Sequence, residues 1–201
     1  MHFIDREVRL TDDAILELIS KCVERDAQAF ERLVRQFQSF AFALAMRLLA
    51  DEDEAKDVVQ ECFVRVWTNI NRFDQKRKFT TWLYRIVTNL AVDRLRAMRR
   101  SRRIFFARDE HVEPGDAQST EDIAEIESNR ELAAMINDLT RELPVKQRLV
   151  FTLRDLQDLS VEEVAEVATM SVGSVKTNLH YARKRIRRLL ALKYNIARLE
   201  P

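Results

Sequence analysis

The stretch SVEEVAEVATMSVGSVKTNLHYARKRIRRLL, residues 160–190, decides the fold. It opens with Ser160 and Glu163, which have the spacing of a capping box, where each side chain bonds the other residue's backbone at a helix N-terminus. A short apolar helix follows, and residues 169–171 make a turn in which Ser171 is suited to cap the next helix. Capping box, turn and long second helix, in this order, predict a helix-turn-helix.

The second helix of this pattern has one apolar and one basic side. Apolar residues recur at helical spacing from Val172 to Leu189. The opposite side carries Lys176, Thr177, Asn178, His180, Tyr181, Arg183, Lys184 and Arg187. Cations, amides and a hydroxyl group on one helix face suit the major groove of DNA. We therefore favour DNA binding over an ordinary helical hairpin with a solvated basic face.

The chain upstream of this motif also has a helical pattern. Apolar stripes with helical spacing run through residues 14–23, 30–48, 55–67 and 82–95, and Thr11 and Asp51 are suited to cap two of the helices. Four amphipathic helices in succession predict a compact four-helix bundle. Within it we expect the large residues Phe63, Trp67, Trp82 and Ile86 to be mainly core.

Composition supports an all-α protein and excludes several kinds of site. Only two of the 201 residues are glycine, so no clustered glycine motif for phosphates and no nucleophile elbow can exist. The three histidines and two cysteines are scattered, so we expect no metal site, no cofactor and a reducing compartment. Residues 40–46 form the longest apolar run, too short to cross a bilayer, and the N-terminus does not resemble a signal peptide. We expect a soluble, cytoplasmic protein that is not an enzyme.

The net charge of +1 hides a strong segregation of charge along the chain. Residues 51–61 and 109–131 are mainly acidic, whereas residues 94–103 and 176–198 are basic. Two basic blocks in separate folded parts suggest two contacts with one polyanion. The acidic segment, poor in large apolar residues, predicts a linker at 104–128 between domains at 1–103 and 129–201.

Two further surfaces stand out in the N-terminal half. The loop at 71–82 mixes four cations with three aromatic residues, a combination that suits single-stranded DNA because cations follow phosphates and rings hold unstacked bases. The helix at 55–67 leaves Asp57, Gln60, Glu61 and Arg65 on its polar side. Bundle packing does not require this group, so a protein contact is a second interpretation beside a solvated face.

Three stretches together resemble a known family. They are DVVQECFVRVW at 57–67, FTTWLYRIVTN at 79–89 and the helix-turn-helix, in that order. They resemble extracytoplasmic-function (ECF) sigma factors, the compact two-domain members of the sigma-seventy family, over residues 27–190. The resemblance implies an all-α fold with an N-terminal sigma region 2 bundle, a flexible acidic linker and a C-terminal region 4 helix-turn-helix domain.

The resemblance also implies partners and a role for individual residues. The partners are core RNA polymerase (β′ clamp and β flap), promoter DNA and an anti-sigma factor, with no membrane insertion and no small-molecule substrate. Polymerase binding is carried over to Asp57, Gln60, Glu61, Phe63 and Arg65. Recognition and melting of the minus-ten element is carried over to Arg72, Lys76, Lys78, Phe79, Thr81, Trp82, Arg85, Asn89, Arg96 and Arg100. Recognition of the minus-thirty-five element is carried over to Ser171, Lys176, Thr177, Asn178, His180, Tyr181, Arg183 and Lys184.

The sequence also departs from the family's pattern. Many members have Arg at the positions of Asn178 and Tyr181, and helix-turn-helix motifs often have Gly at the position of Thr169. Cys62 stands where Thr or Ala is common, and we favour inert packing over a redox role. No region 1.1 and no Cys- or His-rich extension is visible, which argues against self-inhibition and metal sensing. The alternative function is a one-component helix-turn-helix repressor or activator, with the bundle as a ligand or dimer domain.

Overall fold

The computed structural model describes the backbone of residues 10–106 and 134–194, and the side chains of residues 10–98 and 134–194. All regular secondary structure in these ranges is helical. The predicted linker falls almost wholly outside them, so its boundaries stay a prediction. At its start the fourth helix continues to Phe106, past the predicted domain end at residue 103.

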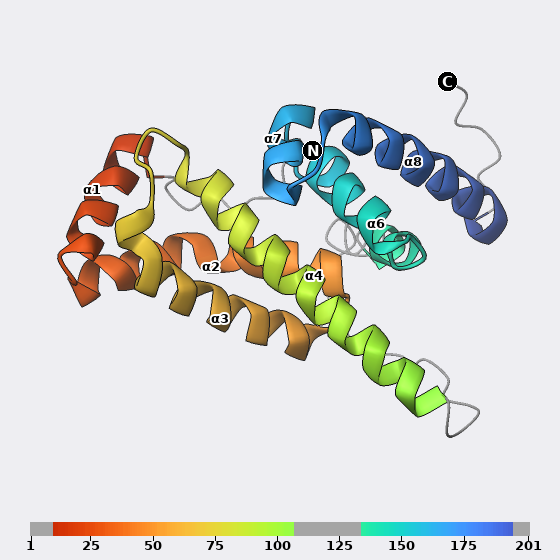
Figure 1. Ribbon diagram of the computed structural model, residues 1–201, viewed down its shortest axis with the longest axis horizontal. Helices are drawn as coiled ribbons and strands as arrows, with labels where there is room; N and C mark the ends of the chain where they lie inside the picture. Colours follow the sequence, from red (N-terminus) through yellow and green to blue (C-terminus); the bar gives the residue numbers. More distant parts are fainter. Residues whose placement is uncertain (1–9, 107–133, 195–201) are drawn as a thin grey trace, which may run out of the picture.

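The N-terminal part is a bundle whose helices begin where the sequence supplies caps. Thr11 Oγ1 accepts the N–H of Ala14 at 3.3 Å, and Asp51 Oδ1 accepts the N–H of Glu54 at 3.0 Å, which confirms both predicted caps. Asp26 caps the second helix in the same way. The elements are α1 (Asp12–Val23), α2 (Ala27–Leu49), α3 (Glu52–Asn69), the short 3-10 turn η1 (Ile70–Arg72) and α4 (Phe79–Phe106) (Figure 1).

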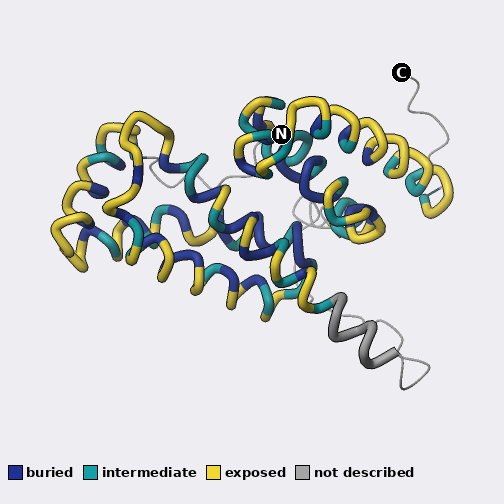
Figure 2. Tube along the Cα trace, viewed as in Figure 1, coloured by how far each residue is buried: buried dark blue, intermediate teal, exposed yellow. Residues whose placement is uncertain are grey.

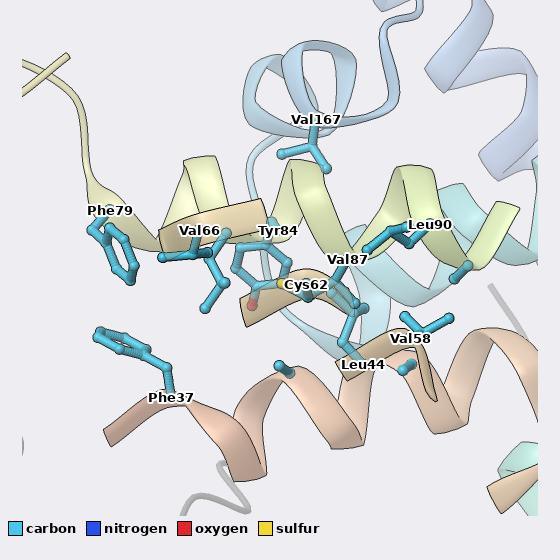
Figure 3. Close-up of a cluster of buried hydrophobic side chains, with 14 of the residues drawn as sticks. Phe37, Leu44, Val58, Cys62, Val66, Phe79, Tyr84, Val87, Leu90 and Val167 are labelled. Carbon is cyan, nitrogen blue, oxygen red and sulfur yellow. The ribbon is translucent and has the colours of Figure 1, made fainter. Parts of the chain in front are cut away.

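The core of the bundle lies between α2, α3 and α4, as predicted from the apolar stripes. Leu44, Cys62 and Val87 are completely buried there, one from each helix, and Figure 3 shows them facing one another. Phe63 is buried, whereas Trp67, Trp82 and Ile86 are only half-buried. The packing role expected of these large residues is therefore complete for Phe63 and partial for the other three.

The C-terminal part contains the predicted helix-turn-helix. Glu163 Oε2 accepts the N–H of Ser160 at 2.8 Å, and Ser160 Oγ accepts the N–H of Glu163 at 3.2 Å, so the capping box is complete. Ser171 Oγ accepts the N–H of Ser174 at 3.2 Å and caps the second helix. After a helical stretch at 134–141 the elements are α6 (Val145–Phe151), the π-helical turn η2 (Thr152–Leu156), α7 (Val161–Ala168) and α8 (Val172–Tyr194).

The turn between α7 and α8 uses a left-handed residue other than glycine. Thr169 has φ 53° and ψ 50°, the conformation in which glycine usually ends a helix. A β-branched residue is uncommon there, and such a conformation typically costs about 1–3 kcal/mol. The N–H of Met170 still reaches the carbonyl of Ala165 at 2.9 Å, so the cap forms despite the missing glycine.

The two parts pack against each other (Figure 1), with α7 lying on α4. The buried Arg148 guanidinium donates to the carbonyl of Leu48 at 2.8 Å, and Tyr84 and Gln157 are joined by a side-chain hydrogen bond of 3.1 Å. Buried residues of both parts form one continuous cluster. Figure 2 shows that α8 and the outer side of α3 remain largely exposed in this arrangement.

Candidate nucleic-acid and polymerase interfaces

The loop before α4 is fixed by an aromatic cluster. The ring centroids of Phe73 and Phe79 lie 5.7 Å apart, and both rings lie under 6 Å from Trp82, at 5.4 and 5.8 Å. Phe37 of α2 anchors the cluster, with its centroid 5.0 Å from that of Phe79. At the loop's tip, Asp74 Oδ1 accepts the N–H of Lys76 at 3.0 Å, which closes an Asx turn. The loop is thus held as a rigid platform.

The structure separates the predicted minus-ten residues by exposure. Thr81 and Trp82 are half-buried beside the loop, and Phe79, at 4% exposed, belongs to the core. The Phe79 ring therefore supports Trp82 from below and does not itself offer a surface to a partner. The Arg100 side chain lies outside the described residues. The exposed members are Arg72, Lys76, Lys78, Arg85, Asn89 and Arg96.

A cavity of about 280 Å³ lies at the centre of this surface. From the N-terminal bundle the Trp82 indole lines it together with three arginines and one carboxylate, Arg72, Arg77, Arg85 and Asp74. Glu166 and Val167 of α7 line its other side. The surface expected to hold a nucleic-acid strand is therefore partly covered by the chain's own C-terminal part.

The exposed side of α3 carries the predicted polymerase-binding group. Asp57, Gln60, Glu61 and Arg65 are all exposed, whereas Phe63 is 7% exposed and packs inward. Arg65 pairs with Glu61 at 2.6 Å. Hence Phe63 orients the helix, and only the polar members of the predicted group present themselves to a partner.

Two residues near this group were missed in the sequence. Arg94 of α4 pairs with Asp57 at 2.9 Å and also with Glu54, and so ties α3 to α4 behind the acidic surface. Val64 is 62% exposed in the middle of the same face as Gln60 and Glu61. An apolar residue outside the buried stripe of an amphipathic helix is the signal that could have indicated Val64.

The outer face of α8 presents most of the predicted minus-thirty-five residues. Ser171, at the turn before α8, is exposed too. The His180 and Tyr181 rings lie side by side, with centroids 5.5 Å apart, and Tyr181 is 54% exposed. The other exposed members of the predicted set are Lys176, Thr177, Arg183 and Lys184.

Two predicted minus-thirty-five residues are engaged within the protein. The amide of Asn178 donates to the carbonyl of Ser174, one turn earlier, at 2.8 Å. Arg183 forms a double hydrogen bond with Asp155 of η2, at 2.8 Å from Nε and 2.6 Å from Nη2, which raises the pKa of the guanidinium. In this arrangement Arg183 positions α8 on the π-helical turn, while its side chain remains 50% exposed.

The two cysteines, Cys22 and Cys62, lie in the core of the N-terminal bundle. Both thiols are completely buried, and burial raises the pKa of Cys62 to about 12 and that of Cys22 to about 11. A thiol protonated at neutral pH is a poor nucleophile, which agrees with the packing role favoured for Cys62. Among the described residues, no cluster of metal-binding side chains and no helix able to span a membrane is found.

Comparison with known proteins places both parts of the chain. Residues 33–101 match the Sigma-70 region 2 family, and residues 133–186 match Sigma-70, region 4. The chain is 32% identical over 189 residues to the ECF RNA polymerase sigma factor SigW of Bacillus subtilis, covering 88% of this chain and 96% of that protein. It is 33% identical over 184 residues to the ECF RNA polymerase sigma-E factor of Escherichia coli, covering 89% and 93%.

Solved structures agree with this placement. CnrH, in complex with the cytosolic domain of CnrY, superposes with a TM-score of 0.60 at 25% identity, covering 88% of this chain and 97% of CnrH. The sigma factor RpoE of Bartonella quintana, in complex with the anti-sigma factor NepR, has the same fold, with a TM-score of 0.63 at 21% identity over 86% of this chain and all of RpoE. The chain therefore belongs to the ECF sigma factors of the sigma-70 family.

Proposed function

We propose that the chain binds core RNA polymerase and directs promoter-specific initiation through minus-ten and minus-thirty-five contacts. The observation that carries this proposal is the pair of separate DNA-compatible surfaces in one sigma-family chain. One is the cation-rimmed aromatic loop before α4, and the other is the exposed face of α8. We also propose that an anti-sigma factor holds the chain until a stress or envelope signal releases it; RpoE, which has the same fold, occurs in a complex with the anti-sigma factor NepR.

Polymerase contact is assigned to the exposed side of α3. Gln60, Glu61 and the apolar Val64 lie within two turns of one helix face, and Asp57 is oriented by Arg94. Single exposed apolar residues are common on protein surfaces, so the assignment rests on the family's polar group, with Val64 lying among its members. We expect this face to meet the β′ clamp.

Minus-ten contact is assigned to the loop and the first turns of α4. Lys76, Lys78 and Arg85 are exposed and can follow phosphates, while the half-buried Trp82 can stack with an unpaired base. Since Phe73 and Phe79 pack against the indole, its position is fixed before DNA arrives. A base stacked on such a ring gains about 1–3 kcal/mol.

Minus-thirty-five contact is assigned to the open face of α8. Thr177, His180 and Tyr181 can meet base edges in the major groove, while Lys176 and Lys184 can reach phosphates. Arg183 keeps its partner Asp155 and fixes the angle of the helix. Asn178 and Tyr181 depart from the family pattern described above, so the minus-thirty-five sequence read by other members does not carry over to this chain.

Neither surface is large enough to open a promoter alone. Separating the strands loses about 1.4 kcal/mol of stacking per base-pair step. If polymerase holds both parts of the chain at fixed spacing on one promoter, the second contact becomes intramolecular and gains effective concentration. We therefore expect weak binding of duplex by the isolated chain and tight binding by the holoenzyme.

The test is run-off transcription with core polymerase, using Val64→Glu and Val23→Glu as matched variants. Both valines are exposed, at 62% and 42%, but only Val64 lies on the proposed polymerase face. We expect initiation to depend on the chain, to fall at least tenfold with Val64→Glu and to persist with Val23→Glu. Failure to initiate at any promoter tried with a verified active core would contradict the proposal. Tight, polymerase-independent binding to palindromic duplex would favour the one-component repressor instead.

A further inference from the structure

Helix α7 has two packed sides, only one of which belongs to the helix-turn-helix. Val164 is completely buried in the core, Ala165 and Ala168 pack against it, and α7 also packs against α8. Val167, three residues after Val164 on the helix, is completely buried too. Figure 3 shows its side chain pointing from α7 toward α4, above Tyr84 and Val87. Val167 is therefore buried by the N-terminal bundle.

The side of α7 that packs on the bundle, here called its outer side, is acidic. The loop that it faces is mainly basic. Glu163 lies one turn before Glu166 and Val167 on α7, and Glu166 and Val167 line the same cavity beside Trp82. Glu166 forms an ion pair with Arg77 of the loop before α4. The charge of Lys78 helps to lower the pKa of Glu163, after the larger contribution of hydrogen bonds from Ser160. The contact thus combines opposite charges on α7 and the loop with the burial of Val167 against the bundle.

The contact covers one proposed DNA surface and leaves the other open. Glu166 and Val167 close one side of the cavity lined by Trp82 and Arg85, so a strand stacked on Trp82 would have to displace α7. In contrast, Lys176, His180 and Lys184 on α8 remain exposed. The helix that covers the minus-ten surface therefore carries no proposed minus-thirty-five contact.

We propose that the acidic outer side of α7 docks on the loop and first turns of α4 and competes there with single-stranded DNA. This inference rests on the minus-ten role proposed above for the same surface. It revises the expectation that the chain holds no self-inhibiting element. The docked segment can be displaced, since the Arg77 and Glu166 side chains are 60% and 42% exposed and such pairs are weakened by salt.

Docking can be measured without any DNA. Cysteines introduced at the exposed positions Ser39 and Leu192 would carry a fluorophore pair, because the natural thiols are buried and react slowly. We expect Glu166→Arg and Val167→Glu to lower energy transfer in the full chain. Glu162→Arg is the matched control, since it makes the same charge change on α7 without contacting Arg77. Combining Arg77→Glu with Glu166→Arg should restore the transfer.

Competition is measured on the same unlabelled variants with a fluorescein-labelled degenerate single-stranded 12-mer. If the surface is open about one tenth of the time, release of α7 tightens binding up to about tenfold. We expect this gain for Glu166→Arg and not for Glu162→Arg, with circular dichroism confirming that each variant is folded. Glu166→Arg serves as the second test if Val167→Glu does not fold.

Two results would overturn the inference. Unchanged energy transfer in folded Glu166→Arg would show that α7 does not dock in solution. Lower energy transfer with unchanged affinity for the 12-mer would show that docking does not compete with DNA. Both differ from failure of the proposed function, because run-off transcription depends on polymerase whereas energy transfer does not.

Discussion

The two surfaces proposed to contact DNA differ in how they are built and in what lies over them. The minus-ten surface is a loop locked by Phe73, Phe79 and Trp82 and partly covered by α7. The minus-thirty-five surface is the open side of α8, held from behind by Asp155. The first depends on the core shared by both parts of the chain, and the second on the packing of α8 against α6 and α7 together with the Asp155 contact. Changes under the first surface should therefore disturb stability more than changes on the second.

The largest effect is expected from Phe79→Ala. Its ring is 4% exposed and touches the aromatic residues of both α2 and the loop, so truncation should destabilise the bundle by about 3–5 kcal/mol. Urea unfolding followed by circular dichroism measures the change. Tyr181→Ala on α8 is the comparison, and its 54% exposed ring should contribute less than about 0.5 kcal/mol. Equal losses at the two positions would contradict the difference drawn between the surfaces.

A smaller effect is expected where α8 is held from behind. Asp155→Asn weakens the double hydrogen bond to Arg183, and a hydrogen bond to a charged group contributes about 1.5–3 kcal/mol. We expect a lower thermal midpoint and weaker minus-thirty-five binding by the holoenzyme. Asp158→Asn is the control, since Asp158 is 83% exposed in its pair with Arg154. If both variants melt together, the Asp155 contact does not position α8.

These elements also show how far the sequence alone could lead. Helical spacing and capping residues predicted the bundle and the helix-turn-helix, because both are local properties of the chain. Thr11, Asp51 and Ser160 cap helices as predicted. The family's motifs likewise indicated which helices carry the candidate surfaces.

What the sequence could not predict was long-range packing. The contact of Glu166 with Arg77 joins residues 89 positions apart, and that of Arg183 with Asp155 joins residues 28 apart. Such pairs depend on how helices are placed, so Arg183 was assigned to DNA although Asp155 holds it. Phe63 and Phe79 were assigned to surfaces for a similar reason, since a family motif does not separate contact residues from those that support them.

A third prediction concerns the cap at the start of α7, and it includes a pH dependence. Ser160→Ala removes the Ser160 hydroxyl of the capping box and should destabilise the chain by about 1 kcal/mol. Hydrogen bonds from Ser160 lower the pKa of Glu163 below 4.5, so the charged form is favoured in the folded state. Its contribution to stability is then present above pH 4.5 and is lost as the pH falls through the folded-state pKa.

Chemical unfolding of the wild type and Ser160→Ala at pH 7 and at mildly acidic pH measures both the loss of stability and its pH dependence. We expect the difference in unfolding free energy between the wild type and Ser160→Ala to shrink in acid. The Ser160 hydroxyl then no longer donates to a charged Glu163 carboxylate. Ser174→Ala is the control, since Ser174 is not part of this cap. A difference that is unchanged between the two pH values would show that Glu163 contributes no charge-dependent stability.

The smallest effect separates the two neighbouring cations of α8. Lys184 is exposed on the open face, whereas Arg183 is committed to Asp155. Removing a residue that neutralises one phosphate reduces the slope of log K against log salt by about 1. Titrating holoenzyme binding to promoter DNA with salt should therefore give a shallower slope for Lys184→Ala. Arg183→Ala should weaken binding but keep the slope, because it alters the placement of α8 without changing the number of phosphate contacts. The reverse result would return Arg183 to the minus-thirty-five contact expected from the family resemblance, with its guanidinium on a phosphate, and assign Lys184 to the solvated side of the helix.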